Sequence, residues 1–503
     1  MVAHSPERAP SGIAGLDQIL DGGFPRNRIY LVSGPPGSGK TTLALQFLLQ
    51  GRQQGESGIY VALSETEREL RDVAVSHGWS LDGLSICDLQ NSQESLRADA
   101  QYTFFHPSEV ELSETTRTLL GEVDRVKPLR VVFDSLSEMR LLARDSLRYR
   151  RQVLALKQYF SERNCTVLLL DTVEPGSNDE FQLESIAHGV LVLQQLAPDY
   201  GGERRRLRFV KLRGLRFRDG WHDYVIRTGG MHVFPRLIAS EQAQIEPGKR
   251  ARSGVAELDE MLGGGLDRGT SALFLGPAGV GKSTLAMQYV RTEAAGGKPA
   301  CVYVFDETQA AWLHRSDGLG LGLRAEVESG RVILRQVDPA ELSPGEFAHM
   351  VRADVEATDS KLVVIDSLNG YQTAMPQEQF LLLHMHELLT FLAHRGVLTI
   401  MLMAQHGIVG GGVQAPLELS YVADTVVLLR YFEAAGKVRQ AVAAVKKRTG
   451  GVQRSVRELR IGPPSGVRVG RELTEFAGVL AGDAVYRGDQ GPLFDDHARE
   501  SRD

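Results

Sequence analysis

Short apolar runs alternate with longer, helix-like amphipathic stretches through most of this 503-residue chain. The runs occupy residues 29–32, 58–66, 129–136 and 166–171, and then 272–275, 301–308, 361–368 and 398–403. Apolar strands that are separated by helices are typical of parallel sheets covered on both faces. The pattern therefore predicts an α/β fold that is built twice.

The sequence around these elements also repeats. SGIAGLDQILDGGF at 11–24 is echoed by SGVAELDEMLGGGL at 253–266. The stretch between the halves is polar and contains Pro247 and Gly248, which favours a linker. We predict a first domain over residues 1–240, a linker over 241–252 and a second domain over 253–480. Residues 481–503 are rich in Asp, Gly and Arg, which predicts a disordered tail.

Composition and charge exclude several classes of protein. With 42% hydrophobic and 24% charged residues, the chain resembles an ordinary globular protein. Its three cysteines include no C-x-x-C pair, so neither a disulfide framework nor a zinc site is indicated. Neither a signal-peptide core nor an apolar run of about 18 residues is present, which predicts a soluble, cytoplasmic protein without a membrane partner. A net charge of −6 gives no general attraction to nucleic acid.

Each half contains the phosphate-binding pattern G-x-x-x-x-G-K-[ST] between an apolar run and a helical pattern. In that context, backbone N–H groups and the helix N-terminus would surround phosphates, the lysine would reach the terminal phosphates, and Thr41 or Ser283 would bind Mg²⁺. A glycine-rich turn without a ligand is the alternative, and two matches in context disfavour it. The predicted nucleotide-binding residues are Gly34, Gly37, Ser38, Gly39, Lys40, Thr41 and Thr42, and Gly276, Gly279, Val280, Gly281, Lys282, Ser283 and Thr284.

Carboxylates end the strands that are expected beside these loops. Asp134 and Asp366 each follow an apolar run, so each would lie at a strand tip where a Mg²⁺-bound water can be held. Glu65, and Asp306 with Glu307, end the strand after the phosphate-loop helix, where a carboxylate can polarise a water or hydroxyl aimed at the γ-phosphate. The alternatives are a turn residue for the two aspartates and a solvated strand end for the other three residues.

A basic segment closes each half. GERRRLRFVKLRG at 202–214 and VRQAVAAVKKRTG at 438–450 share only their last cations, which are Lys211 and Arg213 in the first half and Lys446 and Arg448 in the second. Such cations suit contact with one phosphate better than a strip along a nucleic-acid backbone. A plain surface cluster is the alternative.

These residues together give the chain a close resemblance to the KaiC family of double-domain RecA-type ATPases and autokinases of the circadian clock, and to bacterial KaiC-like proteins outside it. The resemblance covers about residues 10–469. It includes the two phosphate loops, the repeated lead-in segment before each loop (11–24 and 253–266) and the acidic strand ends. It also includes Asp134 and Asp366 in their DSL sequences and the two basic strands that end in K-x-R, at Lys211 to Arg213 and Lys446 to Arg448. It implies two tandem RecA-like P-loop ATPase domains with mostly parallel sheets flanked by helices. It also implies ATP and Mg²⁺ as cofactors and a homo-hexamer with ATP at the subunit interfaces.

The resemblance implies roles for single residues as well. Asp306 and Glu307 match the family's catalytic carboxylates, and Ser420 and Tyr421 fall at its adjacent serine and threonine phosphosites. Three features depart from the family: Tyr421 replaces a threonine, Ser64 replaces the first carboxylate of the first domain, and the tail differs from the clock-partner-binding peptide. The residues that match contacts to a neighbouring subunit's nucleotide are Lys211, Leu212, Arg213, Lys446, Lys447 and Arg448.

We therefore expect an ATPase and serine/threonine autokinase that signals through its phosphorylation state to a protein partner. Two alternatives stay open. The same core serves RecA, RadA and DnaB-like DNA-dependent ATPases, although the net negative charge and the lack of a basic aromatic loop disfavour nucleic acid. The other alternative is a nucleotide-switched scaffold whose sites bind ATP with little turnover.

Overall fold

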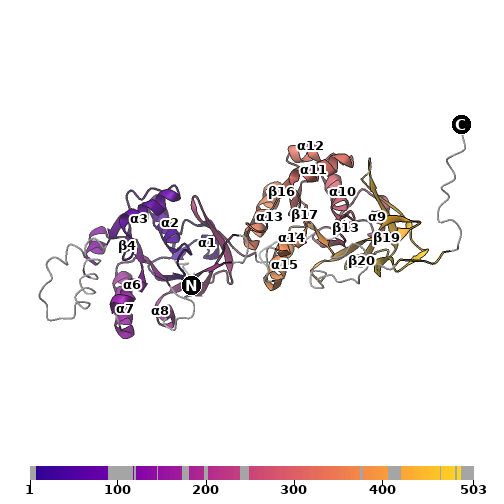
Figure 1. Ribbon diagram of the computed structural model, residues 1–503. Coiled ribbons are helices and arrows are strands. Elements are labelled where there is room, and N and C mark those ends of the chain that lie inside the picture. The colour runs from indigo at the N-terminus through magenta and orange to yellow at the C-terminus, as the bar shows by residue number, and fades with distance from the viewer. Residues whose placement is uncertain are drawn as a thin grey trace, which may run out of the picture. The chain divides into compact units, whose positions relative to one another are not determined.

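The computed structural model describes most of the chain (Figure 1). The described residues are 7–88, 117, 120–143, 145–172, 180–197, 202–237, 249–373, 378–405, 421–464, 466–481 and 484–488. The chain divides into two compact units, unit 1 from Met1 to Arg236 and unit 2 from Leu237 to Asp503. The boundaries at 240 and 252 stay predictions, because residues 238–248 lie outside the described part.

Unit 1 is an α/β domain built on one large sheet. Its described helices are α1 (Ala14–Ile19), α2 (Lys40–Gln53), α3 (Glu67–Ser76), α6 (Leu136–Ala143), α7 (Ser146–Glu162) and α8 (Glu180–Ile186). Its described strands are β1 (Arg8–Ala9), β2 (Phe24–Pro25), β3 (Ile29–Gly34), β4 (Gly58–Ala62), β5 (Ser85–Asp88), β6 (Arg130–Asp134), β7 (Thr166–Thr172), β8 (Gly189–Leu196), β9 (Arg204–Leu212), β10 (His222–Arg227) and β11 (Gly230–Phe234).

Unit 2 repeats this plan. Its described helices are α9 (Ala256–Met261), α10 (Lys282–Ala295), α11 (Gln309–Gly318), α12 (Leu323–Glu328), α13 (Pro344–Thr358), α14 (Leu368–Thr373), α15 (Glu378–His394) and the 3₁₀ turn η2 (Val479–Ala481). Its described strands are β12 (Arg250–Ala251), β13 (Leu266–Asp267), β14 (Ser271–Gly276), β15 (Ala300–Val304), β16 (Val332–Gln336), β17 (Leu362–Asp366), β18 (Leu398–Ala404), β19 (Thr425–Ala434), β20 (Lys437–Lys447), β21 (Val456–Gly462), β22 (Gly466–Glu472), β23 (Phe476–Ala477) and β24 (Val485–Tyr486). Among the described helices of both units, none is long and apolar enough to cross a membrane.

The large sheets have the same topology, β5-β4-β6-β7-β3-β8-β9-β10-β11 in unit 1 and β16-β15-β17-β18-β14-β19-β20-β21-β22 in unit 2. Neighbouring strands are parallel from β5 to β8 and from β16 to β19. The remaining pairs are antiparallel. The prediction of mostly parallel α/β sheets is confirmed. Because β3 and β14 are central, the loops that follow them leave from the middle of each carboxyl edge.

Each central strand contributes side chains to two hydrophobic cores. In β3, Tyr30 and Val32 pack with residues of α1, α2 and α3, whereas Ile29 and Leu31 pack with residues of α6 and α7. The helices accordingly lie on both faces of the sheet (Figure 1), and unit 2 has the same arrangement around β14. Burial on both faces explains why these strands are unbroken apolar runs rather than alternating ones.

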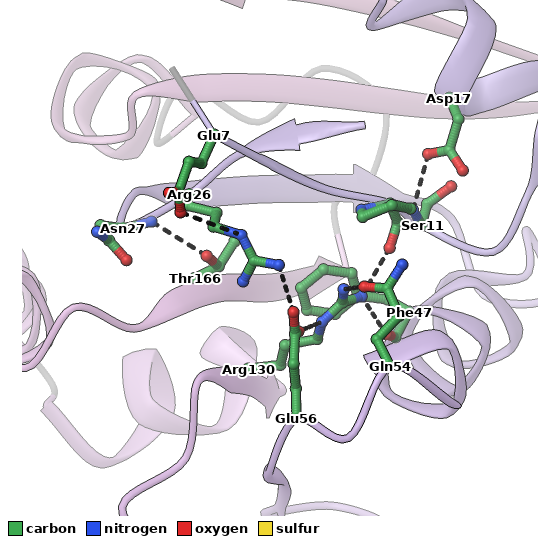
Figure 2. Close-up of polar contacts among 11 residues, drawn as sticks. Glu7, Ser11, Asp17, Arg26, Asn27, Phe47, Gln54, Glu56, Arg130 and Thr166 are labelled. Atoms are coloured by element: carbon green, nitrogen blue, oxygen red, sulfur yellow. Dashed lines mark hydrogen bonds and ion pairs between the residues drawn. The ribbon is translucent and has the colours of Figure 1, made fainter. Parts of the chain in front are cut away.

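A buried arginine fastens the start of unit 1 to its sheet (Figure 2). Arg130 begins β6, has no exposed side-chain surface, and donates from Nη1 to the carbonyl oxygens of Pro10 (2.6 Å) and Phe47 (2.8 Å). Its Nε pairs with Glu56, which also pairs with Arg26. Burying a charge is tolerated only with pairing and hydrogen bonding of this kind. Arg130 therefore holds the lead-in segment, α2 and β6 together.

Unit 2 fills the same space with different residues. Leu362 occupies the strand position of Arg130, and Glu293 occupies the helix position of Gly51. Arg268 pairs with Glu293 there. In unit 1, a Cβ on Gly51 would lie 2.5 Å from the Cδ and Nε atoms of Arg130. The buried arginine therefore requires a glycine on the facing helix.

The C-terminal segment corrects one prediction. Strand β24 pairs with β23, and the Tyr486 ring centre lies 5.4 Å from that of Phe476, which lies 5.4 Å from that of Phe432. The expectation of disorder from residue 481 onward was wrong for these strand residues, because aromatic packing outweighs the polar composition around it. Residues 489–503 of the predicted tail lie outside the described residues.

We predict that Gly51→Ala destabilises unit 1 by about 1–3 kcal/mol, because the new methyl group overpacks an arginine that its hydrogen bonds hold in place. Calorimetry of the full chain would show the unit 1 transition at lower temperature. The matched control is Gly121→Ala, at a helical residue whose Cβ would meet nothing within 4 Å, and it should cost nothing. In an Arg130→Leu background the Gly51→Ala penalty should vanish. Equal penalties in both backgrounds would contradict the steric explanation.

Candidate functional site

The phosphate-loop glycines occupy positions that need them. Gly39 and Gly281 adopt left-handed conformations, with φ of 87° and 104°, as the N-caps of α2 and α10. A Cβ on Gly34 would lie 2.8 Å from a carbonyl oxygen of β8, and one on Gly276 would lie 2.4 Å from a carbonyl oxygen of β19. Each loop therefore packs against the sheet and presents a helix N-terminus at the carboxyl edge, which is how anion-binding sites are built.

The other predicted loop residues support this geometry. Gly37 and Gly279 both have φ of 76°. Ser38 is buried and donates to the Pro35 carbonyl oxygen (2.7 Å), while Val280 belongs to the core of unit 2. Thr42 and Thr284 are the third residues of α2 and α10 and are also buried.

Each loop lysine folds back onto its own loop. The Lys40 Nζ donates to the carbonyl oxygens of Gly34 (2.9 Å) and Pro35 (3.0 Å), and the Lys282 Nζ makes the matching contacts at 2.9 and 2.8 Å. Burial lowers the pKa of both ammonium groups, to about 8 for Lys282. A phosphate would replace these carbonyl oxygens as the acceptor, because its charge-assisted hydrogen bonds with the ammonium group are stronger.

Asp134 ends β6 and faces the hydroxyl that the unit 1 loop supplies. The Thr41 Oγ1 lies 3.4 Å from the Asp134 Oδ2, and the Tyr60 hydroxyl donates to the same oxygen. Burial raises the pKa of Asp134, and the hydrogen bond from Tyr60 and the charge of Lys40 partly oppose this shift. A carboxylate beside a hydroxyl is a donor set that Mg²⁺ accepts.

Asp366 repeats this arrangement at the end of β17. Burial raises its pKa to about 6, Glu307 adds to the shift, and a hydrogen bond from Ser283 opposes it. A bound divalent cation would favour the ionised carboxylate. The predicted metal residues of unit 2 therefore lie together, as those of unit 1 do, and both sets fit Mg²⁺.

Glu65 follows β4 and has a buried Oε2 without a hydrogen-bond partner among the described residues. Burial is the main cause that raises its pKa to about 7; the charges of Asp134 and Glu69 add to it, and Lys40 and Thr41 oppose it. A carboxyl group that titrates near neutral pH is well matched to accepting a proton from water.

Both predicted carboxylates of unit 2 are engaged by other side chains. The Ser367 hydroxyl donates to the Asp306 Oδ2 (2.5 Å), and the Arg315 Nη1 and Nη2 donate to the Glu307 Oε2 (2.8 Å) and Oε1 (2.6 Å). Our sequence reasoning missed Arg315. Its position in unit 1 holds Val73, so a residue-by-residue comparison of α3 with α11 would have found the added cation.

A further carboxylate at the carboxyl edge of unit 1 was also missed. Asp171 in β7 lies 2.6 Å from the Arg140 Nη2 and contributes to the field at Lys40. The equivalent position of β18 holds Met403. The contrast between TVLLLD and LTIMLM was the available signal.

The K-x-R cations lie at the opposite edge of the sheet from the loops. Lys211 pairs with Val190, which pairs with Leu31 early in β3, whereas the loop leaves the other end of β3. The cations donate to carbonyl oxygens near the start of β8 or β19: Lys211 to Glu184 (2.5 Å), Arg213 to Ser185 (2.8 Å), Lys446 to Ala423 (2.7 Å) and Arg448 to Tyr421 (2.7 Å).

The middle residues of the two K-x-R strands point into their own units. Leu212 is part of the unit 1 core. The Lys447 side chain has no exposed surface, lies 3.6 Å from Asp267 and donates to the Gly265 carbonyl oxygen (3.0 Å). The side chains of both residues are therefore committed to internal packing.

Of the two predicted phosphosites, only Tyr421 lies within the described residues. Ser420 lies outside the described residues. The Tyr421 side chain is 71% exposed, and its carbonyl oxygen is the one that Arg448 binds. Tyr421 therefore lies at the same edge of the sheet as the K-x-R cations, away from the loop of its own unit.

Comparison with known proteins supports one assignment for both units. The family model described as "ATPase: KaiC" matches residues 9–238 and again residues 251–474. The chain is 26% identical over 493 residues to the circadian clock protein KaiC3 of Synechocystis sp., covering 95% of each chain. It is 25% identical over 492 residues to the circadian clock oscillator protein KaiC of Parathermosynechococcus lividus, covering 94% of this chain and 87% of that one. The doubled loops, the strand-end carboxylates and these matches together mean that the chain belongs to the KaiC family of ATPases.

Proposed function

We propose that both units bind Mg-ATP at their phosphate loops, that the protein hydrolyses ATP, and that its second unit phosphorylates Ser420, with Tyr421 weaker or silent. The proposal includes a homo-hexamer in which the K-x-R cations complete a neighbour's site, and a role in signal transduction or circadian-type regulation. The observation that carries it is the separation of two sets of residues. Loops, aspartates and glutamates lie at one edge of each sheet, and the cations and Tyr421 lie at the other.

The distance along the strands argues against a contact between the K-x-R cations and the phosphate loop of the same unit. Lys446 lies level with Leu273 of β14 through Val426, and Gly276 is three residues further on, or about 10 Å along a strand. The Lys446 Nζ also binds the Ala423 carbonyl oxygen, on the side away from the loop. A cation placed there lies away from the loop of its own unit and would suit a phosphate that another chain supplies.

Exposed apolar residues beside the cations support the same interface. Val210 and Val445 directly precede the two K-x-R sequences and are 44% and 41% exposed. Their matching positions in two diverged units favour a surface that a neighbouring subunit covers.

The proposed transfer uses the residues of two chains. Loop N–H groups and Lys282 would hold the γ-phosphate, and Mg²⁺ on Ser283 and Asp366 would neutralise charge that develops on its oxygens. The Ser420 Oγ of the neighbouring chain bonds to the γ-phosphorus, the bond to the β–γ bridging oxygen breaks to release ADP, and the hydroxyl proton passes to the Asp306 and Glu307 pair.

Mixed assemblies test the shared site. Chains with Arg448→Ala keep an intact loop, chains with Lys282→Ala keep Arg448, and each alone should lose most second-unit phosphorylation. Mixed one to one in Mg-ATP, they should recover about a quarter of the wild-type level, because random neighbours restore that fraction of interfaces. Intact mass should find the phosphate on the Lys282→Ala chains. A mixture with the double variant is the control, and rings of six that show no recovery would contradict a site shared between chains.

Phosphopeptide mapping after incubation with Mg-ATP tests the acceptor. Phosphate should appear on Ser420, disappear in Ser420→Ala and persist in Tyr421→Phe. Glu307→Gln should slow its appearance about 100-fold or more, because the proton acceptor is lost. Wild-type protein that hydrolyses ATP without labelling Ser420 would contradict the autokinase proposal. Stimulation of hydrolysis by DNA would instead favour a nucleic-acid motor.

A further inference from the structure

The ion pair between Arg315 and Glu307 occupies both oxygens of a carboxylate at the second nucleotide site. The two Nη atoms donate to one oxygen each, at 2.8 and 2.6 Å. The Arg315 and Glu307 side chains are 34% and 20% exposed, so the pair is partly shielded from water. Planar fork-to-fork pairs of this kind are among the strongest side-chain contacts to a carboxylate.

Among the described residues of unit 1, no arginine makes a matching pair with Glu65. Helices α3 and α11 are both ten residues long and begin two residues after the glutamate, so Val73 holds the position of Arg315. On α3, Glu69 contributes to the raised pKa of Glu65 and caps its own helix by accepting from the Thr66 N–H at 2.7 Å. Glu65 keeps a buried oxygen without a hydrogen-bond partner among the described residues.

This difference has a chemical meaning. A carboxylate accepts a proton from water through a lone pair on one oxygen, and it has about four such positions. A guanidinium fork takes one position on each oxygen and holds the carboxylate in one orientation. The Arg315 fork therefore leaves fewer lone-pair positions on Glu307 for a water proton than the sequence indicates.

We propose that Arg315 restrains Glu307 as an acceptor of a proton from water, and so slows hydrolysis of ATP at the second site. The inference rests on the proposed function, because it requires ATP at the second loop. In the restrained step, a water oxygen bonds to the γ-phosphorus, the bond to the β–γ bridging oxygen breaks to give ADP and phosphate, and the water proton goes to the glutamate. Arg315 acts through Glu307 and is a positioning residue.

Removing the Arg315 side chain should raise the rate of ATP hydrolysis at the second site. Damage to the fold would lower that rate instead. In a Glu65→Gln background, which silences unit 1, Arg315→Met should increase phosphate release from Mg-ATP at least about threefold. Arg315→Lys should give an intermediate rate, because an ammonium cannot make the bidentate contact. Adding Glu307→Gln should abolish the gain. The control is Arg324→Met, which breaks the neighbouring Arg324 to Asp317 pair (2.7 Å) and should leave the rate unchanged.

The reciprocal change tests unit 1. In a Glu307→Gln background, Val73→Arg should lower phosphate release severalfold by placing a guanidinium near Glu65. Val75→Arg adds the same charge on the same helix, at a side chain that is 72% exposed, and should have little effect.

The outcomes distinguish a failure of the proposed function from a failure of the inference about Arg315. No ATP hydrolysis in the wild type or any variant would overturn the proposed function, and the inference with it. Hydrolysis that is present but unchanged or lowered by Arg315→Met would overturn the inference alone. A gain that survives Glu307→Gln would also overturn it, because the effect would then bypass the carboxylate.

Discussion

Burial of the loop lysine against the carboxyl edge of a parallel sheet is the interaction on which each site depends. The ammonium is held by the first two carbonyl groups of its own loop, and burial lowers its pKa. The same burial raises the pKa of Asp134 and Asp366 beside it. Burial therefore disfavours both kinds of charge in the isolated chain. A phosphate with a divalent cation would supply the missing counter-charges, so the site is electrostatically complete only with its ligand.

The two units share a backbone plan but differ in the side chains that surround the same positions. Arg130 and Gly51 in unit 1 correspond to Leu362 and Glu293 in unit 2. At the catalytic edge, Arg315 is present only in unit 2 and Asp171 only in unit 1. The second set of differences lies beside the catalytic residues rather than in the loops themselves. Two sites with the same phosphate-binding motif can therefore have different reactivity.

The fold and the phosphate loops were accessible from sequence because each depends on local pattern. Strands buried on both faces are continuous apolar runs, and the glycines of the loop are required by φ values near 76–104°. The pairing of Arg315 with Glu307 was not accessible in this way, since it depends on how one helix turns back toward a strand end. The burial of Lys447 against Asp267 was hidden for the same reason. Ordering of Tyr486 depends on contact with Phe476, which composition does not record.

The fit between Gly51 and Arg130 also limits how the two repeats can evolve. If α10 replaced α2 alone, its glutamate would enter the volume that the Arg130 guanidinium fills. If β17 replaced β6 alone, the carbonyl groups of Pro10 and Phe47 would lose their shared donor. Recombination between the repeats is therefore tolerated only when helix and strand are exchanged together. The two repeats therefore diverge separately, because each must keep its own matched strand and helix residues, Arg130 with Gly51 or Leu362 with Glu293.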